Sequence, residues 1–262
     1  MESAGVSAYD AIAPRFDRDR ALPEGVGDAI RAAVLAAAGV ARPRLLDLGA
    51  GAGRIGRPFV TAGDDYVGAD LSFGMLQAFA ARGDSARLVQ ADGLRLPFGA
   101  AAFDAVLLVQ VFGGMRAWQT FAAEVRRVLR TPGVVLIGRT VTPDDGVDAR
   151  MKRELGVILG ESGKIGSKTG GKARENIERL FGASAARAER RVVASWSAPR
   201  TPRQFIGRHR TGARFSTLPD AVKDDAMRRL GTWAETAFGS LDATSSETHS
   251  FELHVFKFEG AA

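Results

Sequence analysis

The stretch Arg44-Leu45-Leu46-Asp47-Leu48-Gly49-Ala50-Gly51-Ala52-Gly53-Arg54 decides the fold of this chain. An apolar run of strand length ends at an acidic residue, three alternating glycines follow, and a helical pattern begins at Ile55. Strand, glycine turn and helix in this order build a ligand crevice at the carboxyl ends of the strands of an open α/β sheet. Glycine accepts a positive φ and places no Cβ between the backbone and a ligand. The stretch therefore predicts the floor of a site for a nucleoside-containing cofactor.

Two glycine patterns overlap in this turn and indicate different cofactors. Gly49, Gly51 and Gly53 fit the G-x-G-x-G turn of S-adenosylmethionine enzymes, whereas residues 51–56 fit the G-x-G-x-x-G fingerprint of dinucleotide sites. Asp47 favours the first, because its carboxylate would repel a pyrophosphate at the helix N-terminus. S-adenosylmethionine has no phosphate and carries a positive ammonium and a positive sulfonium group. The alternative for Asp47 is a helix-capping or turn carboxylate.

Length and composition indicate a soluble globular protein. The 262 residues suffice for one α/β domain with a sizeable core and a small cap, and 45% hydrophobic and 25% charged residues are ordinary values. The absence of cysteine excludes disulfides, cysteine–metal sites and thiol nucleophiles. Residues 1–30 contain no secretory apolar core and residues 29–41 are too short to span a bilayer, so we expect a cytoplasmic protein without membrane insertion.

The charge balance raises the question of a nucleic-acid partner. The net charge is +6 and the sequence pI is about 10.1. The arginines are scattered, with a denser set over residues 172–214. Such arginines more often form a solvated face than a phosphate-binding track, so nucleic acid is the less favoured partner.

Apolar periodicity and turn residues predict a regular α/β alternation up to residue 140 and a less regular arrangement beyond it. Strands are expected at 44–48, 65–69, 86–90, 105–111 and 134–139, with helices at 23–38, 55–62, 73–81 and 118–129. Ser72 is expected to cap the helix that follows it. Later elements are expected as a helix at 144–159, a loop at 160–171, a helix at 172–180, a strand at 191–195, a short helix from Pro202, a helix at 219–238 and a final strand at 251–258.

Several motifs in a fixed order resemble those of class I S-adenosylmethionine-dependent methyltransferases. The resemblance is greatest to the branch called methyltransferase type 11, which includes quinone-biosynthesis methyltransferases, and it covers residues 7–140. The stretches that carry it are residues 45–53, Gly68-Ala69-Asp70-Leu71-Ser72 through Met75, Gln90-Ala91-Asp92-Gly93, Leu96-Pro97-Phe98, Phe103-Asp104-Ala105-Val106, residues 124–130 and Pro132-Gly133.

The resemblance implies a Rossmann-like, doubly wound and mostly parallel sheet whose last strand is antiparallel, with a small helical cap. We expect a single methyltransferase domain over residues 1–262. Within it, a cofactor-binding core spans 7–140, a substrate-binding cap spans 141–215, and residues 216–262 complete the sheet.

The resemblance also assigns cofactor contacts. Gly49 and Gly51 would let the backbone approach the methionine part of S-adenosylmethionine. Asp70 would accept hydrogen bonds from both ribose hydroxyls, and Asp92 would accept one from the adenine amino group. An acidic residue at the position of Asp70 serves NAD equally well, and Asp92 could instead be a turn aspartate. The predicted contacts are Asp47, Gly49, Ala50, Gly51, Asp70, Leu71, Met75, Asp92, Gly93, Leu94, Gln110 and Arg20.

No residue pattern identifies a catalytic base. Methyl transfer depends mainly on alignment, and a base is needed only when the acceptor proton has a high pKa. The candidates are Gln110, at the end of the fourth strand where the family places a position near the reactive methyl group, and His209. His249 and His254 would face opposite sides of a strand, so no metal site is predicted.

The expected activity is S-adenosylmethionine-dependent methylation of an oxygen, nitrogen or carbon of a small-molecule acceptor. A homodimer is compatible with this reading. A nucleic-acid methyltransferase is the first alternative, although residues 110–113 lack the Asn/Asp-Pro-Pro-aromatic turn typical of base-amine methylation. An NAD-dependent oxidoreductase and a non-catalytic cofactor-binding regulator are the others.

Overall fold

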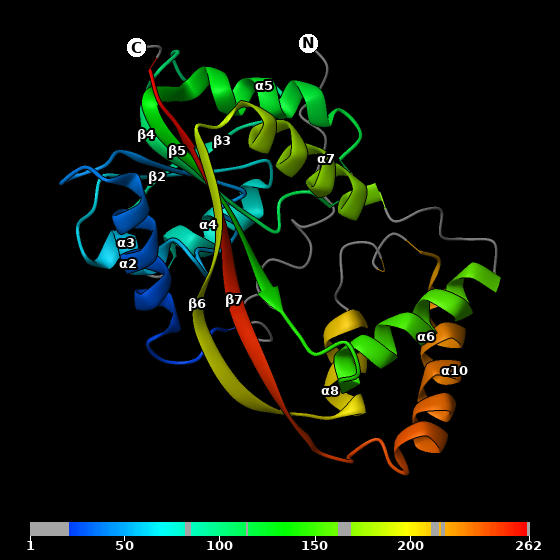
Figure 1. The fold of residues 1–262 in the computed structure, drawn as a ribbon. Coiled ribbons are helices and arrows are strands. Elements are labelled where there is room, and N and C mark those ends of the chain that lie inside the picture. Colours follow the sequence, from blue (N-terminus) through cyan, green and yellow to red (C-terminus); the bar gives the residue numbers. More distant parts are fainter. Residues whose placement is uncertain are drawn as a thin grey trace. The chain divides into compact units, whose positions relative to one another are not determined.

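The chain folds into two compact units in a computed structural model that describes residues 21–81, 85–113, 115–161, 169–210, 215 and 218–260 (Figure 1). The first unit comprises Met1–Arg139, Lys168–Ala194 and Phe251–Ala262, and the second comprises Thr140–Ser167 and Ser195–Ser250.

A seven-stranded sheet organises the first unit, and its order is β3-β2-β1-β4-β5-β7-β6. Strands β1 to β5 are parallel to one another and β7 is antiparallel, which confirms the predicted fold class. The order reverses between β1 and β4, where the chain leaves room for a ligand at the carboxyl ends of the strands. The strands are β1 Leu45–Leu48, β2 Tyr66–Asp70, β3 Arg87–Gln90, β4 Phe103–Val109, β5 Leu129–Val141, β6 Arg187–Arg200 and β7 Ser245–Phe258.

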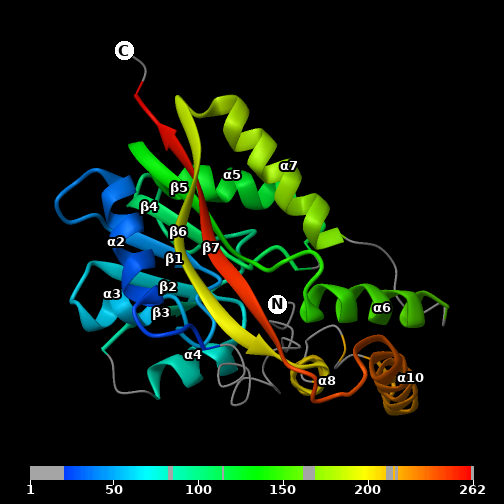
Figure 2. The same cartoon turned by 60° about the horizontal axis from the view of Figure 1, so that its bottom comes forward.

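Helices cover both faces of the sheet in the first unit (Figure 2). One face carries α2 (Val26–Ala38), α3 (Arg57–Thr61) and α4 (Phe73–Ala80), and the other carries α5 (Trp118–Val128) and α7 (Thr169–Ser184). Because both faces are covered, central strands should be apolar throughout, and β4 is buried at every position except Asp104.

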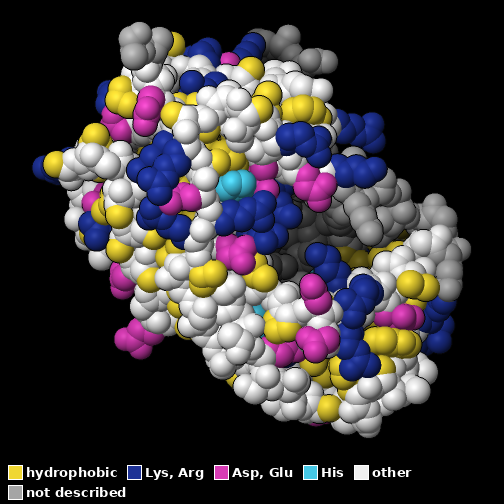
Figure 3. Space-filling model, viewed as in Figure 1, with side chains coloured by type: hydrophobic (Ala, Val, Ile, Leu, Met, Phe, Trp, Pro, Cys, Tyr) yellow, Lys and Arg dark blue, Asp and Glu magenta, His cyan; other side chains and the backbone are white. Residues whose placement is uncertain are grey.

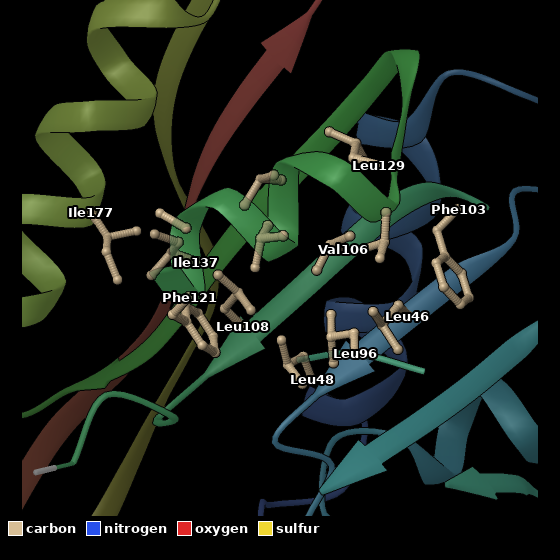
Figure 4. Packing of buried hydrophobic residues seen from close by; sticks show 14 of the residues in the cluster. Leu46, Leu48, Leu96, Phe103, Val106, Leu108, Phe121, Leu129, Ile137 and Ile177 are labelled. Carbon is tan, nitrogen blue, oxygen red and sulfur yellow. The ribbon is translucent and has the colours of Figure 1, made fainter. Parts of the chain in front are cut away.

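The main core of the first unit lies between the sheet and helices α5 and α7. Figure 4 shows Leu108 and Ile137 of the sheet directed towards Phe121 of α5, with Ile177 of α7 beside them. All four side chains are at most 2% exposed. Burial of such apolar surface is the main favourable term in folding, so this layer fixes the strand ends that surround the ligand crevice.

Several elements are longer than the sequence pattern predicted. Strand β6 covers 14 residues instead of 191–195, and β7 begins at Ser245 instead of residue 251. Most residues of β6 are exposed or half-buried, so it offers no apolar run by which its ends could be recognised. Helix α7 begins inside the expected loop at 160–171, because burial of Ile177 and Phe181 outweighs the poor helix propensity of its glycines.

The second unit has a core of its own among three helices. These helices are α6 (Val147–Glu161), α8 (Pro202–Arg210) and α10 (Asp220–Phe238). Met151 of α6, Phe205 of α8 and Leu230 of α10 are at most 1% exposed and pack in one cluster.

Glu247 of β7 supplies a buried cap for helix α6. Its Oε1 accepts a hydrogen bond from the backbone N–H of Val147 at 2.5 Å. A Cβ at Gly146 would lie 2.7 Å from Oε2 of Glu247, so a glycine is needed for this approach. The first N–H groups of a helix have no partner within the helix, and a carboxylate there also interacts favourably with the helix dipole.

We expect Glu247→Ala to destabilise the second unit by about 1–3 kcal/mol, because it leaves a buried N–H group without an acceptor. Glu247→Gln keeps an acceptor oxygen at the same place and should retain most of the stability. Hydrogen exchange at the first amides of α6 measures the effect locally. Equal exchange in wild type and Glu247→Ala would show that the carboxylate does not hold this helix end.

The basic composition is partly offset by acidic neighbours. Where described residues are visible in Figure 3, Lys and Arg side chains are interspersed with Asp and Glu. In the arginine-rich set, Arg187 and Arg191 pair with Glu189, and Arg190 pairs with Glu178. None of the described helices is both long and apolar enough to cross a membrane.

Candidate active site

A cavity of about 630 Å³ lies at the carboxyl ends of β1, β2 and β4 in the first unit. The structure brings together at this cavity the predicted contacts Asp47, Gly49, Ala50, Gly51, Asp70, Leu71, Met75, Asp92, Gly93, Leu94 and Gln110. Arg20 lies outside the described residues. His209 belongs to α8 of the second unit, where its ring stacks on Phe205, and it is not part of the cavity lining.

The glycine turn after β1 forms the cavity floor. Gly49 and Gly51 have φ values of 91° and 56°, in the region that side-chain-bearing residues rarely adopt. A Cβ at Gly51 would have only a backbone oxygen, 4.0 Å away, within reach. The backbone of this turn is therefore open to close approach by a ligand.

Asp70 ties the glycine turn to the end of β2. Its Oδ2 accepts a hydrogen bond from Gly51 N–H and its Oδ1 accepts one from Ser72 N–H, both at 2.8 Å. Asp70 also lines the cavity. Ser72 accepts a hydrogen bond from Met75 N–H and caps α4, as the sequence predicted.

Asp47 is a buried carboxylate that lines the cavity at 1% exposure. Its Oδ2 accepts a hydrogen bond from the Tyr66 hydroxyl at 2.8 Å, and the N-cap of α3 is Gly56, so Asp47 does not cap that helix. Burial raises the pKa of Asp47 to about 7; the hydrogen bond from Tyr66 opposes this, the charge of Asp70 adds to it, and Arg54 lowers it. A costly buried charge at a cavity is typical of a ligand site.

Asp92 has both a turn role and a place at the cavity. Its Oδ1 accepts a hydrogen bond from Leu94 N–H at 2.9 Å, and its carbonyl accepts one from Arg95 N–H at 2.9 Å. The side chain is exposed and lines the cavity. Gly93 packs closely on α5, because a Cβ there would lie 2.6 Å from the Phe121 ring.

Gln110 lies just beyond the last residue of β4, although the sequence placed it within the strand. Its φ is 56°, an uncommon value for a residue other than glycine, and its side chain is exposed at the cavity. Its Oε1 accepts a hydrogen bond from an Arg54 Nη at 3.0 Å. Strained backbone of this kind often accompanies functional sites, and here it turns the chain at the end of the central strand.

Sequence reasoning did not assign Arg54, Arg116 and Tyr66 to the site. Arg54 and Arg116 both line the cavity, and each follows the carboxyl end of a strand, which is the signal that could have found them. Tyr66 touches Asp47 only because β1 and β2 pair with Asp47 opposite Gly68, a register that the sequence does not specify.

Gly56, the last glycine of the dinucleotide fingerprint, makes room for Tyr66. A Cβ at Gly56 would overlap the Tyr66 hydroxyl. Helix α3 begins only at Arg57 and has five residues, so it offers a poor N-terminus for a pyrophosphate. The carboxylates of Asp47 and Asp70 lie beside the turn. They suit a ligand with a positive charge and hydroxyl groups, and they would repel a pyrophosphate.

We expect Gly56→Ala to destabilise the protein by at least about 1–3 kcal/mol, because the added methyl group displaces a buried tyrosine from its place. Gly99→Ala is the matched control, since a Cβ there meets nothing within 4 Å. Denaturant unfolding compares the two variants. If both unfolded like wild type, Gly56 would not be needed for this packing.

Among the described residues, no group of three or more His, Cys, Asp and Glu side chains could hold a metal ion.

Comparisons with known proteins agree with this geometry. A family described as "Methyltransferase domain" matches residues 46–137. The demethylmenaquinone methyltransferase of Streptomyces griseus is 34% identical over 134 residues, which cover 50% of this chain and 58% of the relative. That of Thermus thermophilus is 33% identical over 146 residues, which cover 53% and 66%. The chain thus spans about three fifths of the length of such curated relatives.

Solved structures share the fold at low sequence identity. The YcgJ protein of Bacillus subtilis has a TM-score of 0.55 and 19% identity, covering 89% of this chain and 99% of that chain. Phosphoethanolamine N-methyltransferase 2 of Haemonchus contortus, solved with S-adenosyl-L-methionine, has a TM-score of 0.51 and 18% identity, covering 97% and 56%. Residues 46–137 of this chain therefore match the methyltransferase-domain family, in agreement with the resemblance to class I S-adenosylmethionine-dependent methyltransferases.

Proposed function

We propose that this protein transfers the methyl group of S-adenosylmethionine to a small-molecule acceptor. One observation carries the proposal: Asp47, Asp70 and Asp92 all open into one cavity beside a glycine turn with positive φ. A cofactor with an ammonium group, ribose hydroxyls and an adenine amino group offers a partner to each carboxylate.

Each of the three carboxylates would contact a different part of the cofactor. Asp70 would accept hydrogen bonds from the ribose hydroxyls, and its own hydrogen bonds from Gly51 N–H and Ser72 N–H fix its orientation. Asp92 would accept a hydrogen bond from the adenine amino group, and the backbone of Gly93 would lie along the adenine ring. Asp47 would pair with the ammonium group, whose positive charge suits a buried carboxylate.

The chemistry requires alignment more than acid–base assistance. Bound S-adenosylmethionine supplies an activated methyl carbon, and the electron pair of the broken carbon–sulfur bond remains on sulfur. The chain holds the acceptor in line and excludes water, which can lower the barrier by about 7–11 kcal/mol. Gln110 and Arg54 are hydrogen-bonded to each other at the cavity and would orient the acceptor.

The acceptor would be selected by residues outside the matched stretch. The family match ends at residue 137, and the second unit, built from 140–167 and 195–250, lies beyond it. We assign the substrate-binding cap to this unit, whose bounds differ from the cap expected at 141–215, since Lys168–Ala194 belong to the first unit and the second extends to Ser250. Since the curated relatives are named demethylmenaquinone methyltransferases, demethylmenaquinone heads the panel of acceptors to be tried.

Calorimetry with S-adenosylhomocysteine tests the cofactor assignment. We expect saturable binding to the purified chain, and no comparable binding of NADH. Mass spectrometry of reactions with S-adenosylmethionine then searches an acceptor panel for a gain of one methyl group. Binding of NADH but not of S-adenosylhomocysteine would replace this proposal with the oxidoreductase alternative, and cofactor binding without methyl transfer to any acceptor would favour a regulator.

A further inference from the structure

Two glycines and two aromatic rings shape the surroundings of Tyr66. A Cβ at Gly56 would overlap its hydroxyl, and a Cβ at Gly68 would lie 3.2 Å from it. The ring stacks on Phe59 at a centroid distance of 5.9 Å and meets Phe79 edge-on at 6.2 Å. These neighbours come from three separate parts of the chain, so the position of the hydroxyl is closely defined.

The hydroxyl group of Tyr66 has a carboxylate as its hydrogen-bond partner, although folding alone would not require a charged acceptor. It donates to Oδ2 of Asp47 at 2.8 Å, and the two residues are 2% and 1% exposed. A buried tyrosine hydroxyl needs an acceptor, but a neutral one would serve at a lower desolvation cost than a carboxylate. The carboxylate at this place therefore indicates a ligand that needs its charge.

We propose that Tyr66 is a positioning residue for the ammonium group of the cofactor. Its hydroxyl donates to Oδ2 of Asp47, which lines the cavity, so that Oδ1 would be the oxygen offered to the ammonium group. This inference rests on the proposed function, because it assumes that the cofactor amino-acid group lies against Asp47.

The groups around Asp47 determine how its proposed contact with the ammonium group depends on pH. Burial raises the pKa of Asp47 to about 7 and the charge of Asp70 raises it further, whereas the Tyr66 hydrogen bond and the charge of Arg54 lower it. Without the hydroxyl, the carboxylate would take up a proton at higher pH. Loss of Tyr66 should therefore weaken ammonium binding most at and below neutral pH and least in mild alkali.

Two probes separate the ammonium contact from the rest of the site. S-adenosylhomocysteine carries the ammonium group, and 5′-methylthioadenosine has the same adenosine and thioether without it. Calorimetry would compare wild type with Tyr66→Phe from about pH 6 to about pH 8.5. We expect Tyr66→Phe to lose about tenfold in affinity for S-adenosylhomocysteine near pH 7, with the loss shrinking at the alkaline end. The affinity for 5′-methylthioadenosine should stay unchanged, which also shows that the cavity remains folded.

The variant Asp47→Asn completes the test. Adding Tyr66→Phe to Asp47→Asn should cause no further loss, because the two residues act through one contact. A loss that is equal for both probes, independent of pH, or additive with Asp47→Asn would overturn the positioning role and leave Tyr66 as packing. If wild type bound neither probe, the proposed function itself would be wrong.

Discussion

Replacement of Asp70 by alanine is expected to weaken S-adenosylhomocysteine binding by about 100-fold or more. The carboxylate would accept hydrogen bonds from two ribose hydroxyls. Each hydrogen bond to a charged group contributes about 1.5–3 kcal/mol to binding. The change also removes the acceptor of Gly51 N–H and Ser72 N–H, so the glycine turn loses its tie to β2. Calorimetric titration of the folded variant measures the effect.

Asp65→Ala is the matched control for Asp70→Ala. Asp65 precedes β2 on the same strand segment and pairs with Arg87, and it is not part of the cavity lining. Its removal should leave the affinity unchanged. A folded Asp70→Ala variant whose affinity stayed within about threefold of wild type would rule out the ribose contact.

Replacement of Asp47 by asparagine is expected to weaken cofactor binding while making the protein more stable. The affinity for S-adenosylhomocysteine should fall by about 10- to 100-fold, because the ammonium group loses its charged partner. The melting temperature should rise by a few degrees, because a buried charge is removed. The amide oxygen of the asparagine would still accept the hydrogen bond from the Tyr66 hydroxyl.

The stability gain has a defined pH dependence. The pKa of Asp47 is raised from 3.8 to about 7 in the folded protein, so the folded state binds a proton more tightly than the unfolded state. Stability therefore falls as pH rises from about 4 to about 7, and the penalty is complete above that range. Asp47→Asn should melt higher than wild type at about pH 8 and equally near pH 4. Equal melting temperatures at both pH values would show that Asp47 carries no such penalty.

The sequence alone determined the class of the fold and the location of the site. The order of strand, glycine turn and helix around Asp47 identified β1, and the unbroken apolar run before Gln110 identified the buried central strand β4. Such local patterns predict parallel strands because a strand covered on both faces must be apolar along its whole length. The ends of β6 and the start of α7 could not be predicted, because exposed strand residues carry no periodicity and α7 depends on buried contacts.

Side-chain partners were decided only by the tertiary structure. Asp70 could be placed at a strand end from its motif, but its bonds to Gly51 and Ser72 depend on how the turn folds back over β2. The link between Tyr66 and Asp47 depends on strand register and on two glycines that a pattern search would assign to other roles. The sequence thus determined which chemical groups reach the cavity, because strand ends are local features. The three-dimensional packing decided which of those groups hold one another, because hydrogen bonds act over about 3 Å between residues distant in the chain.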